Sequence, residues 1–154
     1  TCAALLDRHD NIVAIKEAGG SAARVTQLRA ACGERLVIHS GDDGLTLPFL
    51  SLGAVGVTSV VANVAPHEMV QLVEAWRAGY TARALALHDL IAELTDGMFI
   101  ESNPGPVKAA LALSNLAGPE MRLPMVPVSA ANRDRLAGIL GRFASASAAF
   151  QEMR

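Results

Sequence analysis

Three short stretches of the chain are apolar at almost every position, and helical patterns of roughly ten residues separate them. A strand with one wet face alternates apolar and polar residues, whereas a strand that is apolar throughout is buried on both faces. Such strands, alternating with helices, are typical of parallel sheets built from βαβ units. The sequence therefore predicts an α/β fold with parallel strands at 12–16, 36–39 and 55–61.

Helical patterns account for the rest of the chain. We expect helices at 1–8, 22–31 and 45–52 between the strands, and at 66–78, 81–94, 104–113 and 129–143 after them, followed by a tail rich in Ala and Ser. Ser21 is placed to cap the second helix and Gly33 to end it. Three strands followed only by helices predict the last three strands of a (β/α)8 TIM barrel (1–78) and a C-terminal helical extension (79–154).

Charge and hydropathy exclude two classes of partner. The formal net charge of the 154-residue chain is −2 and its arginines are scattered, so no basic face for nucleic acid is expected. Residues 44–66 carry no charge, but prolines, glycines and polar residues interrupt them. They predict a buried helix and a buried strand, and no membrane span.

The two cysteines, Cys2 and Cys32, show no metal-ligand spacing and no disulfide framework, which favours reduced thiols in the cytoplasm. The chain also begins without Met and inside a helical pattern, so we interpret it as a piece of a longer protein.

Lys16 is the main candidate for chemistry. Alternate strand residues share a face, so Ala14 and Lys16 lie together, opposite Val13, Ile15 and Glu17. Covering helices need the bulky face, which turns Lys16 into the barrel, at the strand end where barrel enzymes place their active sites. A desolvated amine is a nucleophile that can form a Schiff base with a ketone. The alternatives are a structural lysine paired with Glu17 or Asp43, or a strand end that reaches solvent.

Two further residues are candidates for binding. Gly41, in SGDDG after the second strand, allows a ligand to approach the backbone and backbone amides to meet an anion. For Asp42 and Asp43 a plain turn is the preferred interpretation, with Asp43 capping the helix at 45–52. Thr58 is polar within an apolar run, and it either faces a ligand or is a satisfied core hydroxyl.

Other features favour ordinary structural roles. Asn103 is predicted to cap the helix that Pro104 opens, and Lys108 on that helix to be a surface or interface residue. The four histidines are far apart and form no ligand pair, so no metal is expected. Thr1 as an exposed nucleophile is disfavoured, because it opens a helix rather than a strand.

Four stretches resemble one known family, in its order and spacing: NIVAIKEAGG, VIHSGDDGLTLPFLSLGAVGVTSVVANVAP, ESNPGPVKAAL and EMRLPMVPVS. They are similar to the C-terminal half of the dihydrodipicolinate synthase family. The resemblance implies a (β/α)8 barrel with a helical extension, commonly a homotetramer. It also implies the condensation of pyruvate with aspartate 4-semialdehyde, on the route to lysine and diaminopimelate.

By this resemblance Lys16 forms the pyruvate imine, so that no separate cofactor is needed, while Gly41 and Thr58 line the pyruvate site. The family more often has Ile or Val at the position of Thr58. Its paired threonines, proton-relaying tyrosine and carboxylate-binding arginine would precede Thr1. The chain alone is therefore expected to be inactive without the N-terminal half of the barrel.

Alternatives within the resemblance are N-acetylneuraminate lyase and the 2-keto-3-deoxy sugar acid aldolases, which share the lysine. The stretches SGDD and NPGPVK favour the synthase. A non-catalytic remnant that keeps the fold is a further alternative.

Overall fold

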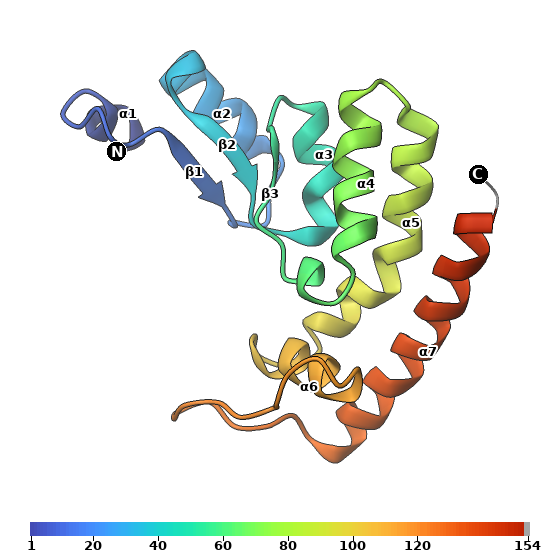
Figure 1. Ribbon diagram of the computed structural model, residues 1–154. Coiled ribbons are helices and arrows are strands. Elements are labelled where there is room, and N and C mark those ends of the chain that lie inside the picture. Colours follow the sequence, from blue (N-terminus) through green and yellow to red (C-terminus); the bar gives the residue numbers. More distant parts are fainter. Residues whose placement is uncertain (153–154) are drawn as a thin grey trace.

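The computed structural model describes residues 1–152. The fold is an α/β unit of three strands joined to a layer of helices (Figure 1). The strand-containing part comprises α1 (Cys2–Leu6), β1 (Ala14–Glu17), α2 (Ala23–Cys32), β2 (Val37–Ser40), α3 (Thr46–Ser51) and β3 (Gly56–Val57). The helical part comprises α4 (Pro66–Arg77), α5 (Thr81–Met98), α6 (Gly105–Leu113) and α7 (Ala130–Glu152). Short 3-10 turns lie at Gly33–Arg35, Asp43–Leu45 and Val61–Asn63.

The three strands form one parallel sheet in the order β1-β2-β3. Lys16 is opposite His39, and His39 is opposite Gly56. The parallel arrangement predicted from the apolar runs is confirmed. The predicted third strand was too long, because the chain leaves the ladder after Val57: the amides of Val60 and Val61 bind the Asp43 carboxylate, 3.0 and 3.4 Å away, and a 3-10 turn follows.

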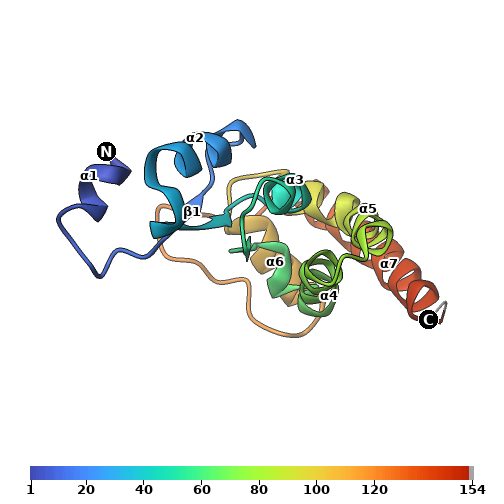
Figure 2. The same cartoon turned by 90° about the horizontal axis from the view of Figure 1, so that it is seen from above.

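Helices α2 and α3 cover one side of the sheet, and no helix among the described residues lies on the other side of β1 and β2 (Figure 2). Ile38 points into the covered side and packs with Val25, Leu28 and Phe49. On the opposite side Ala14 and Lys16 are exposed and Val37 is 39% exposed. The strand therefore turns its faces as its sequence predicts, with Lys16 on the side away from the helices.

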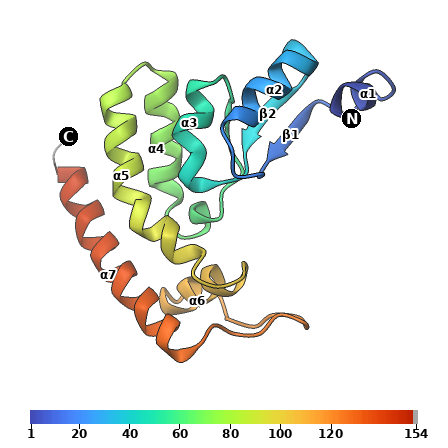
Figure 3. The same cartoon turned by 180° about the vertical axis from the view of Figure 1, so that it is seen from behind.

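The helical layer has its own core. Helices α4 and α5 lie side by side, and α7 runs along α5 on the far side of the molecule from α1 (Figures 1 and 3). Leu72, Leu87, Ile91, Met98 and Leu136 are almost fully buried in it. Helix α5 extends to Met98 instead of ending at residue 94, and α7 continues through the Ala/Ser-rich tail to Glu152.

Two predicted helix caps are wrong. Helix α2 begins after Ala22, and the side chain of Ser21 does not cap it; the Ser21 carbonyl accepts the Arg24 amide instead. Helix α6 has Pro104 rather than Asn103 at its N-cap position, and no side chain of the described residues caps it. Gly33 does end α2, with a positive φ of 59° that suits glycine.

Within residues 1–152, no helix has both the length and the apolar character that crossing a bilayer requires. The uncharged stretch at 44–66 forms α3, β3 and the turn after them.

Candidate active site

Lys16 is the next-to-last residue of the strand β1, and it is exposed on the open side of the sheet. The two acids that could have paired with it bind elsewhere. Glu17 accepts the Gly19 amide at 2.7 Å and lies 3.6 Å from Arg24, on the side of the helices. The interpretation of Lys16 as an ion-pair partner of Glu17 or Asp43 is therefore wrong. The other alternative, a strand end that reaches solvent, agrees with the exposure of Lys16 in this chain.

Gly41 lies against the stem of this lysine. Its amide donates to the Glu17 carbonyl at 2.8 Å, which continues the sheet by one residue beyond β2. A Cβ atom at Gly41 would be 2.9 Å from Cε of Lys16 and 2.6 Å from Cβ of Ala18. Contacts that short require atoms to move, so the absence of a side chain here is what allows Lys16 its position.

Thr58 follows β3, the third strand of the sheet. Its amide donates to the Ser40 carbonyl at 2.7 Å, and its side chain is exposed. The alternative of a buried, satisfied core hydroxyl is therefore wrong. Lys16, Gly41 and Thr58 come from the same end of three adjacent parallel strands, where the chain loops gather in α/β folds.

Asp43 is the residue that the sequence interpretation missed. Its side chain is fully buried, and its carboxylate accepts the hydroxyl of Ser59 and the amides of Val60 and Val61. It therefore does not cap α3, and it joins the loop after β2 to the loop after β3. The capping residue is Asp42, and it caps the 3-10 turn before α3: its side chain accepts the Gly44 amide at 3.0 Å. The signal that could have found Asp43 is an acid between two buried strands of a parallel sheet.

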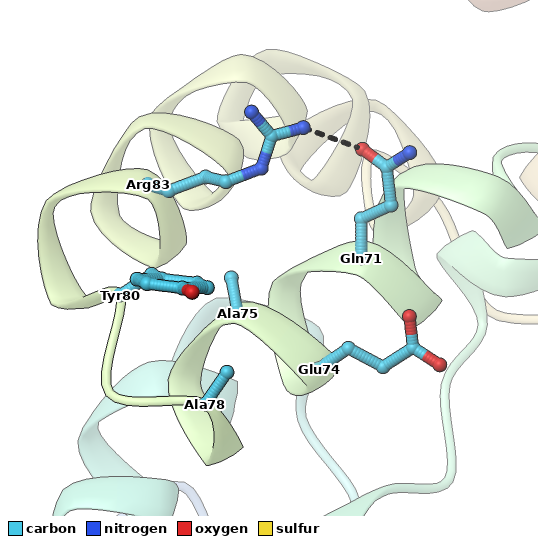
Figure 4. A pocket seen from close by; sticks show the side chains of 6 residues that line it. All are labelled: Gln71, Glu74, Ala75, Ala78, Tyr80 and Arg83. Carbon is cyan, nitrogen blue, oxygen red and sulfur yellow. Dashed lines mark hydrogen bonds between the residues drawn. The ribbon is translucent and has the colours of Figure 1, made fainter. Parts of the chain in front are cut away.

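Two of the hollows bear on the candidate site, one beside the sheet and one between helices. One of about 350 Å³ lies beside the free edge of β3 and has His39, Gly56, Val57 and Ser59 in its wall, with α4 opposite. A larger one, about 490 Å³, lies between α4 and α5 (Figure 4). Its lining includes Tyr80 and Arg83 and none of the three candidate residues, so it is separate from Lys16. Among residues 1–152 no three His, Cys, Asp or Glu residues are grouped as metal ligands.

The family model for the dihydrodipicolinate synthetase family matches residues 1–142. The chain belongs to that family. A 4-hydroxy-tetrahydrodipicolinate synthase of Citrifermentans bemidjiense is 44% identical over 140 residues, which is 91% of this chain and 48% of the relative. The corresponding enzyme of a Synechococcus strain is 48% identical over 130 residues, 84% of this chain and 43% of the relative.

Solved structures of family members agree with the fold. The synthase of Methylacidiphilum fumariolicum SolV superposes with a TM-score of 0.94 at 43% identity, over 98% of this chain and 50% of that one. A chloride-inhibited synthase of Acinetobacter baumannii, solved with pyruvate, gives 0.86 at 36% identity, over 92% of this chain and 49% of that one. The chain thus spans about half the length of the synthases that it matches.

Proposed function

We propose that this chain is the Schiff-base-forming half of a lyase that condenses pyruvate with L-aspartate 4-semialdehyde to give 4-hydroxy-tetrahydrodipicolinate. The observation that carries the proposal is the position of Lys16: it lies near the end of a parallel strand, against Gly41 and on the open side of the sheet, and its amine has no ion-pair partner among residues 1–152. Membership of the synthase family and the similarity to a synthase solved with pyruvate support this substrate.

The reaction follows from the amine. Nζ of Lys16 attacks the ketone carbon of pyruvate, water leaves, and an imine forms. The imine draws electrons from the methyl group, which loses a proton to give an enamine. The enamine carbon adds to the aldehyde carbon of the semialdehyde. The amine of that substrate then attacks the imine carbon, closes the ring and releases Lys16. The bond to Lys16 is covalent and temporary, so no separate cofactor is required.

Turnover needs proton relays and a binding group for the second substrate, which this proposal assigns to the other half of the barrel. We take residues 1–78 as the last three barrel strands with their helices, residues 79–154 as the helical extension, and the assembled protein as a homotetramer. The open side of β1 and β2 and the free edge of β3 support this partner. The cysteines Cys2 and Cys32 are free, which suits the reducing cytoplasm.

Borohydride trapping tests the assignment of Lys16. The chain has two lysines, Lys16 and Lys108, so Lys108 is a control within the same molecule. Incubation with pyruvate and borohydride is expected to leave a reduced pyruvate adduct on Lys16, detected by peptide mass analysis. Lys16→Arg is expected to abolish the adduct and Lys108→Arg to keep it. Equal modification of both lysines, or no pyruvate adduct on Lys16, would overturn the proposal.

A second experiment separates the synthase from the non-catalytic alternative. The chain is mixed with the matching other half of the Methylacidiphilum synthase, and ring formation from pyruvate and the semialdehyde is followed. Turnover by the mixture supports the synthase, and an imine without turnover supports a remnant that keeps only the first step.

A further inference from the structure

Asp43 occupies a connecting position at the strand ends. Its carboxylate is fully buried, yet its three partners all lie on the segment that follows β3: the hydroxyl of Ser59 and the amides of Val60 and Val61. A buried carboxylate that lacks a cation is stabilised by several donors at once, and the two amides begin the 3-10 turn at Val61–Asn63. Ser59 in turn accepts the amide of Ala62 at 2.7 Å, so the first residues of the turn are fixed.

These contacts continue toward Lys16. The Gly41 amide holds the loop after β2 to the carbonyl of Glu17, the residue next to Lys16. Two residues after Gly41, Asp43 binds Ser59, which is the residue next to Thr58. On its other side Thr58 is held by its amide to Ser40. The backbone of Thr58 is thus held to the sheet by its own amide, and the residue after it is held to the loop after β2 by one buried side chain, that of Asp43.

We propose that Asp43 is a positioning residue of the pyruvate site: it fixes Thr58 and the turn after β3 relative to Lys16 and touches no substrate itself. This inference rests on the proposed function. A side chain held within a fraction of an ångström binds a small anion better than one on a free loop, because its ordering is complete before the ligand arrives.

A purely structural acid would give different results. If Asp43 only stabilised the fold, its replacement would weaken the recognition of pyruvate and the reactivity of the Lys16 amine equally, or would leave both unchanged. A positioning residue changes recognition of pyruvate and leaves the amine itself intact. Acetone is the probe for the second property, because it alkylates an accessible amine under borohydride and carries no carboxylate for the site to recognise.

The experiment measures adduct formation on Lys16 against pyruvate concentration, with the whole chain, for Asp43→Asn and Ser59→Ala. Asp43→Asn keeps one acceptor oxygen and replaces the other with a donor. Ser59→Ala removes the hydrogen bond to Asp43 together with the one from the Ala62 amide, and it is the variant to measure if Asp43→Asn does not fold. The matched control is Asp42→Asn, since the Asp42 side chain binds only the Gly44 amide among the described residues.

Loss of one buried hydrogen bond is expected to raise the half-saturating pyruvate concentration about tenfold in both variants. The yield at saturating pyruvate, the acetone adduct on Lys16 and the Asp42→Asn curve are expected to match the unmodified chain. Curves for Asp43→Asn and Ser59→Ala that match the unmodified chain would overturn the inference, as would an equal loss of the acetone adduct. If the unmodified chain itself forms no pyruvate adduct on Lys16, the proposed function fails instead.

Discussion

At the scale of single residues, the most restrictive contact is the one between Gly41 and Lys16. The stem of Lys16 lies where a side chain on Gly41 would be, since an added Cβ would stand 2.9 Å from Cε and 3.0 Å from Cγ. The same added Cβ would stand 2.6 Å from Cβ of Ala18. The lysine cannot keep its place if this glycine is replaced, and an imine requires the amine to be placed accurately.

Gly41→Ala is therefore expected to slow imine formation at Lys16 by about 100-fold, because a misplacement of about 1 Å is enough for such a loss. The rate of the borohydride-trapped adduct measures it. Gly44→Ala is the matched control, because its Cβ would meet Oδ1 of Asp42 at 3.5 Å and Cγ2 of Thr95 at 3.9 Å, both ordinary contacts. A Gly41→Ala chain that reacts at the unmodified rate would refute this role of the glycine.

At the scale of elements, two of the carboxyl groups that contact α7 lie in contrasting surroundings, while a third, Glu93 on α5, pairs with Arg142. Glu68 on α4 and Ser147 on α7 are 7% and 8% exposed, and the hydroxyl donates to the carboxylate at 2.5 Å. At the other end of α7, Glu101 accepts the Asn132 side chain at 2.7 Å and both the amide and the hydroxyl of Ser129 at 3.0 Å. The Glu68 contact is buried and the Glu101 contact is at the surface, so a different experiment tests each of them.

Ser147→Ala is expected to lower the free energy of unfolding by about 1–3 kcal/mol, because a buried carboxylate oxygen loses its donor. Urea unfolding measures the change. Ser145→Ala is the control, since Ser145 is exposed and its side chain binds, within the described part of the chain, only the carbonyl of Gly141, one turn back in the same helix. Equal effects of the two substitutions on the free energy of unfolding would show that the buried contact between Glu68 and Ser147 adds no stability.

The Glu101 contact is expected to make stability depend on pH. The hydrogen bond from Asn132, and then those from Ser129, hold the pKa of Glu101 below its ordinary value. A carboxyl group whose pKa is lowered by folding stabilises the fold above its unfolded pKa, and this stabilisation is lost as the pH falls through the folded pKa. The melting temperature of Glu101→Gln should therefore lie below that of the unmodified chain at neutral pH and approach it in acid. A difference that is constant with pH would contradict this.

Sequence patterns predicted the elements well where one periodicity dominated. The parallel strands and α2, α4 and α6 come from buried apolar runs or amphipathic repeats that no distant contact overrides. The third strand was too long because Val60 and Val61 are apolar and β-branched, while their amides are taken by Asp43 from another loop. A contact between residues 17 or 18 positions apart leaves no trace in local composition. The face of Lys16 was predictable from alternation, but its lack of an acidic partner was not.

At the scale of the whole molecule, the sheet is covered on one side only. On the open side Val37 is 39% exposed, and Leu123 and Val126, before α7, are 87% and 64% exposed. Apolar surface and strand edges of this kind mark interaction sites or cause association. The chain spans about half of its relatives, which is consistent with a partner that supplies further strands.

We therefore expect the chain alone to associate as its concentration rises and to give no turnover. Sedimentation velocity measures the first property and ring formation from both substrates the second. Adding the matching other half of the Methylacidiphilum synthase should reduce the association and produce turnover. A monomeric chain that unfolds cooperatively and is active by itself would contradict the expectation.

The proposed imine between Lys16 and pyruvate can be tested without a reductant, by the carbon-13 spectrum of the chain with pyruvate labelled at its ketone carbon. We expect an imine resonance that is present with the unmodified chain and with Lys108→Arg and absent with Lys16→Arg. A resonance that persists in Lys16→Arg, or that depends on Lys108, would contradict it.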